Sequence, residues 1–157
     1  RGKTRHSGLE AQTRYALGEL SPALDNLSVY ASYAYVNAEI REKGDTYGNQ
    51  VPFSPKHKGT FGVDYKPGSW TFNLNGDFQS SQFADNADGS TGRIPGYMLW
   101  GARVAYDFGP QMANLNLALG VKNIFDHAYY TRSYDDNNKG LYAGQPRTLY
   151  LQGSMKF

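Results

Sequence analysis

The most restrictive feature of this sequence is an alternation of apolar and polar residues with a period of two, which recurs about seven times. Successive side chains of a β-strand point to opposite faces, so each repeat predicts a strand with one apolar and one polar face. The C-terminal stretch shows the pattern clearly, with Leu149, Leu151 and Met155 in its apolar row. The predicted strands cover residues 9–17, 27–35, 60–65, 70–79, 98–108, 115–122 and 148–157.

The composition limits what the apolar rows can contact. Apolar residues make up 39% of the 157 residues, while aromatic residues reach 15%, which is an unusual balance for a packed soluble core. No run approaches the ~20 apolar residues of a membrane-spanning helix, and no stretch has a helical period. The net charge of +2 comes from well-mixed signs, which does not favour nucleic acid as a partner. The chain is therefore predicted to be all-β.

The connections between the predicted strands alternate strictly in length. Short turns follow the first, third and fifth strands, and long polar loops follow the second, fourth and sixth. This is typical of an antiparallel transmembrane β-barrel with short periplasmic turns and long extracellular loops. With that orientation, an aromatic girdle is expected at the periplasmic end of the lipid-facing row. Its members are Tyr15, Tyr65, Trp70, Phe72, Tyr106, Phe108 and Phe157.

About seven strands do not close a barrel, because two edges remain unpaired. Each unpaired backbone group costs several kcal/mol in hydrocarbon. Residues 1–157 are therefore expected to form the C-terminal portion of a larger barrel. A soluble β-sandwich with an aromatic core, for example a lectin that binds through its tyrosine-rich loops, is the alternative that the pattern leaves open.

Several motifs resemble the TonB-dependent outer-membrane receptors of Gram-negative bacteria. These are HSGLEAQ at residues 6–12, GNQVPFSPKH at residues 48–57 and GVKNIFDHAYY at residues 120–130, followed by a terminal strand that ends in Phe157. The resemblance implies a 22-stranded barrel closed by an N-terminal plug, with energy for uptake delivered by the TonB complex. The plug domain, the TonB-contacting segment and the earlier strands are not in this sequence. The resemblance also implies that the terminal Phe157 is an assembly signal for the barrel assembly machinery.

Within that family, the final 25 residues are similar to the end of the ferric dicitrate receptors. This likeness implies a chelate-binding asparagine in the last extracellular loop, which corresponds to Asn137, with Asn138 beside it. Arg132 and Lys139 add donors for a compact polyanion, and tyrosines of the same loop can supply amphipathic walls. The walls would be formed by Tyr129, Tyr130, Tyr134 and Tyr142.

The function predicted from these features is active uptake of an iron chelate, most simply ferric dicitrate. A receptor for another siderophore and a passive porin-type barrel remain as alternatives. No nucleophile motif or metal-ligand spacing is present, so neither an enzyme nor a metal site is predicted, and no resident cofactor is expected. The other expected partner is the lipid and lipopolysaccharide of the outer membrane. The polar rows are expected to form networks on the inner wall, through Lys58, Asp64, Asn73, Asp77, Arg103, Asp107 and Lys122.

Overall fold

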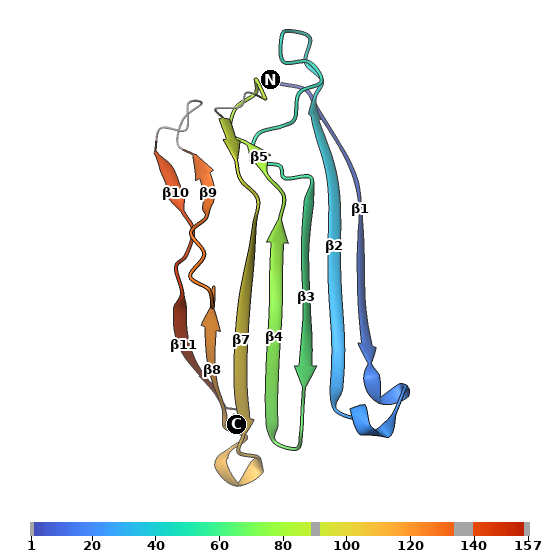
Figure 1. Cartoon of the computed structure of the whole chain (residues 1–157), viewed down its shortest axis with the longest axis vertical. Coiled ribbons are helices and arrows are strands. Elements are labelled where there is room, and N and C mark those ends of the chain that lie inside the picture. The colour runs from blue at the N-terminus through green and yellow to red at the C-terminus, as the bar shows by residue number, and fades with distance from the viewer. Residues whose placement is uncertain (1, 89–91, 134–139, 156–157) are drawn as a thin grey trace.

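A computed structural model describes residues 2–88, 92–133 and 140–155. Its main feature is a curved, seven-stranded antiparallel sheet in the order β1-β2-β3-β4-β7-β8-β11 (Figure 1). The strands are β1 (Thr4–Ala16), β2 (Leu27–Ile40), β3 (His57–Tyr65), β4 (Trp70–Gln79), β7 (Tyr97–Asp107), β8 (Asn116–Lys122) and β11 (Thr148–Ser154). Each strand pairs with the next long strand along the chain, so the sheet is a meander. The prediction of an all-β chain with about seven barrel strands is confirmed.

The two ends of the sheet differ as the loop lengths predict. Short connections lie at one end, where the chain forms the 3-10 turns η1 (Leu17–Glu19), η2 (Pro22–Leu24) and η4 (Pro110–Met112). Long connections lie at the other end, which we call the outer end, and the described chain also starts there (Figure 1). Among the described residues, no helix is long and apolar enough to span a membrane.

Two details of the strands were not foreseen. β1 and β2 both continue past their predicted outer limits, and their ladder reaches the pair Thr4 and Ile40. In these extensions, polar residues occur on both faces, so the apolar and polar alternation cannot be recognised in the sequence. The backbone pairing continues nevertheless. Short two-stranded ribbons also form inside the long connections, and two to four residues are too few for a period to be recognised. They are β5 (Gln82–Phe83) with β6 (Arg93–Ile94), and β9 (Tyr130–Ser133) with β10 (Leu141–Ala143).

The register places all apolar rows on one face, which we call the outward row. Val63 pairs with Leu74, Leu74 pairs with Ala102, and Ala102 pairs with Val121. Within the described part of the chain, no second layer covers this row: Leu149 is 74% exposed and Leu151 is 76% exposed. Among the described residues, the buried apolar side chains are Ala38, Ile40, Ala84, Ile94, Ala105 and Ala118. The sheet has too small a core to be a soluble sandwich, and it is a partial barrel wall with its apolar side open to lipid.

Aromatic residues form two belts across the outward row. The turn-end belt is a chain of ring contacts, with centroids 4.8 to 6.2 Å apart, through Tyr65, Phe72, Trp70, Tyr106 and Phe108. The outer belt contains Tyr33, Tyr35, His57 and Phe78, and the Tyr33 hydroxyl lies 2.6 Å from His57 Nδ1.

The turn-end belt contains five of the seven residues predicted for the girdle, and Phe157 lies outside the described residues. From Trp70 to Phe78 the strand covers about 26 Å at ~3.3 Å per residue. A tilt of ~40° reduces this to about 20 Å, which is comparable with the apolar band of an outer-membrane barrel.

Four glycines in the sheet each face an aromatic ring on the neighbouring strand. A Cβ at any of them would lie 2.2 to 2.7 Å from the ring opposite, so only glycine leaves room for it. The close approach allows the ring to lie flat over the glycine backbone, which offsets the weak strand preference of glycine. The pairs are Gly59 with Phe78, Gly62 with Tyr30, Gly76 with Phe61, and Gly120 with Tyr150.

Candidate ligand-binding site

Three long connections meet at the outer end of the sheet, and we call them the first (residues 41–56), second (80–96) and third (123–147) outer connections (Figure 1). The first and second are joined directly by three hydrogen bonds of 2.8 Å. Phe53 N donates to the Phe83 carbonyl, and Asn49 Nδ2 donates to the Asn86 carbonyl. Gln50 N donates to the Asp88 carboxylate. The two connections are therefore one packed unit.

The third outer connection is tied to the other two by side chains. Gln82, which is 4% exposed, donates from Nε2 to the Thr131 carbonyl at 2.9 Å. The Arg132 guanidinium lies over the Phe53 ring, with Cζ 5.0 Å from the ring centroid. Such a contact between a cation and a ring is worth about 0.5–1 kcal/mol when exposed. Phe53 consequently contacts both other connections, through its backbone N–H and through its ring.

The predicted ligand residues fall in different parts of the third outer connection. Arg132 is an exposed residue of β9, directly opposite Tyr142 of β10. Asn137 and Asn138, the two predicted amide donors, lie outside the described residues. Arg132 therefore has a structural contact with Phe53, and a role in binding is an additional proposal for it.

The base of the third outer connection is held by Asn123, which sequence reasoning did not single out. Asn123 is 5% exposed. Its side-chain amide accepts from His127 N at 2.9 Å and donates to the carbonyls of His127 and Gln145 at 3.0 and 3.1 Å. The backbone of Asn123 has φ +52°, a conformation that asparagine tolerates better than most residues. One side chain thus joins the two arms of the connection. The asparagine immediately after a strand was the available signal.

A second contact fixes the same base. Tyr129 was expected to form part of a wall around the ligand, but its ring packs 4.4 Å from the ring of Tyr97, measured between centroids. The ring also fills the space beside Gly144, where a Cβ would lie 2.1 Å from it, and its hydroxyl accepts from Gln145 N at 3.1 Å. Tyr130 and Tyr142 are 40% and 50% exposed and present accessible rings instead. Tyr134 lies outside the described residues.

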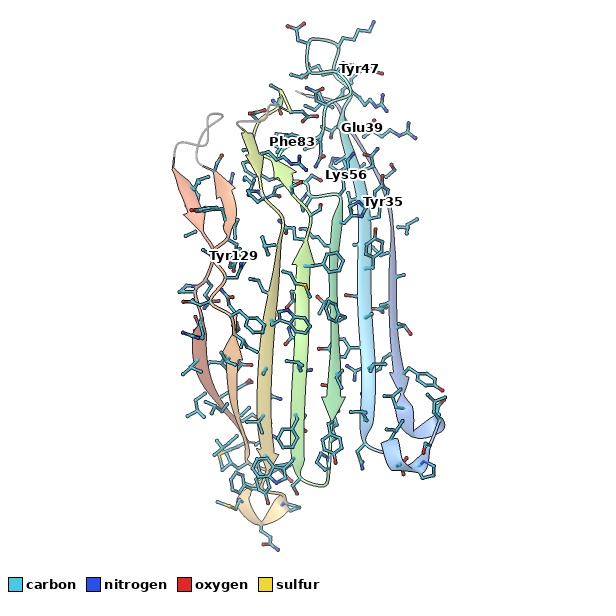
Figure 2. All side chains as sticks on the ribbon, in the orientation of Figure 1. Tyr35, Glu39, Tyr47, Lys56, Phe83 and Tyr129 are labelled. Carbon is cyan, nitrogen blue, oxygen red and sulfur yellow. The ribbon has the colours of Figure 1, made fainter. Side chains whose placement is uncertain are left out.

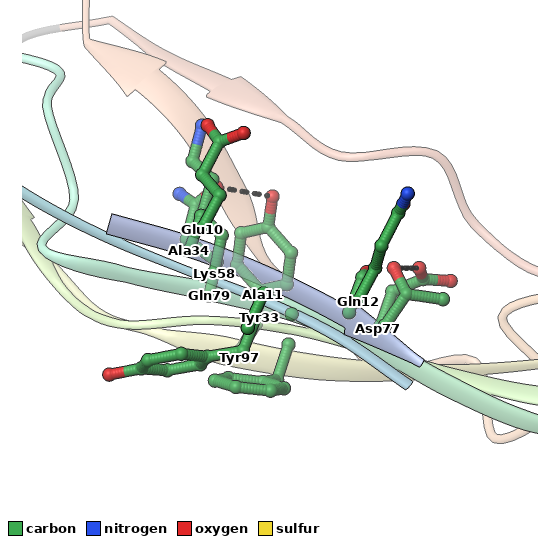
Figure 3. A pocket seen from close by; sticks show the side chains of 13 residues that line it. Glu10, Ala11, Gln12, Tyr33, Ala34, Lys58, Asp77, Gln79 and Tyr97 are labelled. Carbon is green, nitrogen blue, oxygen red and sulfur yellow. Dashed lines mark hydrogen bonds between the residues drawn. The ribbon is translucent and has the colours of Figure 1, made fainter. Parts of the chain in front are cut away.

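The inner face below the connections is a polar surface with a hollow of about 680 Å³. Figure 3 shows Glu10, Lys58 and Gln79 gathered on one side of the ribbon. Within the hollow, Thr60 Oγ1 donates to Asp77 at 2.6 Å. Asn75, beside the hollow, donates from Nδ2 to the other oxygen of Asp77 at 2.8 Å. Charged and amide side chains from the three strands β1, β3 and β4 therefore line this part of the wall.

A second inner-face network lies closer to the short turns. Arg14 pairs with Asp64 at 2.6 Å and lies over the Tyr30 ring, with Cζ 4.8 Å from the centroid. Asn73 Nδ2 donates to the second oxygen of Asp64 at 2.8 Å and to the Tyr30 hydroxyl at 3.1 Å. The predicted wall networks are thus present for Asp64, Asn73 and Asp77. These networks hold the strands together and leave the inner face hydrophilic.

The chemistry that this end offers is reversible binding through hydrogen-bond donors and cations. In the described ranges, no group of three His, Cys, Asp or Glu side chains is placed to hold a metal ion. The exposed arginines Arg93 and Arg132 lie on neighbouring ribbons at the outer end. An anionic ligand with several oxygens suits such a surface.

Comparison with known proteins identifies the family. The model described as TonB dependent receptor-like, beta-barrel matches residues 1–124. The metal-pseudopaline receptor CntO of Pseudomonas aeruginosa is 28% identical over 163 residues, covering 99% of this chain and 21% of that protein. The ferrichrome outer membrane transporter and phage receptor of Escherichia coli K12 is 27% identical, covering 99% of this chain and 20% of that protein.

Among solved structures, unliganded ferric citrate transporter FecA is similar over nearly the whole chain. The TM-score is 0.91 at 82% sequence identity, over 99% of this chain and 25% of that one. The chain thus spans a quarter or less of the length of these proteins. The match explains both the open edges of the sheet and its uncovered outward row, since further strands and lipid complete them. The chain is part of an outer-membrane protein of a Gram-negative bacterium, and it belongs to the TonB-dependent receptor-like β-barrel family.

Proposed function

We propose that this chain is the wall and outer-connection part of an active uptake receptor for ferric dicitrate. The observation that carries the proposal is the 82% identity to the ferric citrate transporter, maintained over 99% of this chain. Loops that bind ligands vary more than the strands that support them. An identity this high therefore extends to the outer connections as well as to the wall.

The chemistry of the outer end supports an anionic cargo. Ferric dicitrate is a compact polyanion, which needs donors and positive charge and no covalent step. Arg132, Asn137 and Asn138 are the residues that we propose to contact it from this chain. The iron chelate is cargo, so the receptor needs no resident cofactor, and transport rather than catalysis is its activity.

The remaining partners follow from the family. Uptake against a gradient needs energy, which we propose is delivered by the TonB complex through a part of the receptor that precedes this chain. We also propose that Phe157 is read by the barrel assembly machinery during insertion. Deletion of Phe157 in the full-length receptor should then lower its outer-membrane yield while the assembled fraction keeps its affinity for ferric dicitrate. An unchanged yield would leave Phe157 as a belt aromatic only.

A receptor for a different metal chelate is the second candidate. The relatives at 27 to 28% identity carry the names of a metal-pseudopaline receptor and a ferrichrome transporter, so receptors with this wall are named for different metal chelates. A passive porin is disfavoured, because the three outer connections are joined to one another above the inner face.

The test is a calorimetric titration of the full-length receptor with ferric dicitrate, ferrichrome and a ferric catecholate. We expect saturable binding of ferric dicitrate alone. The variants Asn137→Ala and Arg132→Gln should each weaken it by roughly 10- to 150-fold, the equivalent of about 1.5–3 kcal/mol for a hydrogen bond to a charged group. Asn116→Ala, at the short-turn end of the inner face, is the matched control and should bind normally. Binding of another chelate in place of ferric dicitrate would support the second candidate.

A further inference from the structure

The outward row becomes charged just beyond the outer belt. Ser7 pairs with Asn37 and Arg5 pairs with Glu39, and the ladder continues where Arg41 N donates to the Lys3 carbonyl at 2.7 Å. These residues alternate in phase with Leu9 and Tyr35, so they share the outward face and not the inner one. We call the set Lys3, Arg5, Ser7, Asn37, Glu39 and Arg41 the outward rim patch.

The outward rim patch lies at the outer margin of the lipid headgroups, within reach of its long side chains. Glu39 and Arg5 lie four residues beyond Tyr35, which is about 13 Å along the strand and about 10 Å along the membrane normal after a ~40° tilt. Figure 2 shows Tyr35, Glu39 and Tyr47 at increasing distance from the short turns. Belt aromatics lie at the boundary of the hydrocarbon, and the headgroup zone extends ~5–8 Å beyond it. Long arginine side chains can reach back into that zone.

The patch has a preorganised centre. Arg41 binds Glu39 through Nη2, and its Nη1 donates to the Tyr47 hydroxyl at 3.2 Å, with the Tyr47 ring centroid 5.5 Å from Cζ. Asn37 Nδ2 donates to the other Glu39 oxygen at 2.7 Å. The Arg41 Nε is buried and has no partner among the described residues. The guanidinium is therefore held in position by Glu39 and Tyr47.

The charge of the patch is not balanced. Three cations, Lys3, Arg5 and Arg41, face one carboxylate, Glu39. The Asn37 hydrogen bond, together with Arg41, Arg5 and Lys56, lowers the pKa of Glu39, so this carboxylate is ionised at neutral pH. Neither Lys3 nor Arg5 forms an ion pair within the described chain. A shallow hollow of about 230 Å³ lies between Arg5, Ser7, Asn37, Glu39 and Arg41.

We propose that the outward rim patch binds the phosphate group of a phosphorylated lipid headgroup in the outer leaflet. Phosphate complements the excess positive charge, and guanidinium groups present the paired donors that phosphate oxygens accept. The position of the patch selects the lipid as the source of the phosphate, because it faces away from the inner wall and directly adjoins the belt. This site lies on the opposite face from the proposed chelate site and does not depend on which chelate is transported.

The test uses the full-length receptor in non-ionic detergent and measures binding of lipid A that carries two phosphates. Arg5→Gln together with Arg41→Gln should weaken binding at least fivefold. The matched control, Lys43→Gln together with Lys66→Gln, removes the same charge from two exposed sites outside the patch and should leave binding unchanged. Arg5→Gln alone should give a smaller loss, and an unfolding midpoint equal to that of the original receptor would show that this variant keeps the fold.

Three results would overturn the proposal. The first is equal binding by the patch variant and the control variant, which would mean that only overall charge matters. The second is equal binding of lipid A from which both phosphates have been removed, which would make the contact purely apolar. The third is competition by inorganic phosphate at concentrations similar to those of lipid A, which would assign the site to a soluble anion.

Discussion

The wall between the two aromatic belts and the outer connections are stabilised in different ways. In the wall, backbone ladders carry the structure, and the outward row presents apolar surface such as Leu74 and Leu149 with no protein layer against it. In the outer connections, a few polar or aromatic side chains, above all Asn123, Gln82 and Phe53, each hold segments that are distant in sequence. The stability of the wall therefore depends on whether each side chain is apolar or polar. The stability of the outer connections depends on the particular side chain at each joining position.

The strongest test of this contrast is a charge placed in the middle of the outward row. Leu74 lies midway between the belts, and Leu74→Arg should reduce the free energy of unfolding in a bilayer by about 2–4 kcal/mol, because the guanidinium is forced into hydrocarbon. Denaturant unfolding of the full-length receptor in liposomes measures this change. Asn75→Arg, one residue along on the inner face, is the control and should cost about 1 kcal/mol or less, for the lost bond to Asp77. Equal losses in the two variants would mean that the outward row does not contact lipid.

In the connections, the largest effect is expected from Asn123→Ala. This change removes three hydrogen bonds at a buried site and leaves their backbone partners unsatisfied, so it should destabilise the third outer connection by about 2–3 kcal/mol. Hydrogen exchange of the full-length receptor should show lost protection at His127 and in the arm around Gln145. Asn49→Ala, which removes one exposed bond to Asn86, should change exchange by less than half as much. Undiminished protection in Asn123→Ala would show that the ladder alone holds the base.

These two regions also differ in how much the sequence could predict. The seven long strands, their faces and the two belts follow from alternation, because a period of two is repeated over enough residues to be recognised. The Asn123 contact could not be predicted in the same way, because its partners His127 and Gln145 are selected by the path of the chain in three dimensions. Arg132 was correctly placed in the third outer connection. Its contact with Phe53 could not be predicted, because the two residues are 79 positions apart in the chain. The side chains that join the outer connections do not recur at regular intervals, so no sequence pattern marks them.

A smaller effect is expected where two connections meet at Phe53. Phe53→Leu retains an apolar side chain and removes the aromatic face below Arg132, so the coupling between the first and third connections should fall by about 0.5–1 kcal/mol. Hydrogen exchange at Thr131 to Ser133 would report the change. Phe53→Tyr keeps the aromatic face and should behave as the original protein does. If both variants behave alike, the ring contact has no energetic role, and the Gln82 bond alone ties the third connection.

The smallest effect is electrostatic and concerns Glu39, at the outer end of β2. The hydrogen bond from Asn37 is the main cause that lowers the pKa of Glu39 below its ordinary value of 4.5, and Arg41 adds to the shift. Because the folded-state pKa is depressed, the stabilisation is present above pH 4.5 and is lost as pH falls through the folded-state value. The difference in unfolding free energy between the original protein and Glu39→Gln should therefore shrink when pH is lowered from neutral to below the folded-state pKa. Asn37→Ala should move this loss toward pH 4.5, since it removes the main cause, and an unshifted profile would assign the effect to Arg41 instead.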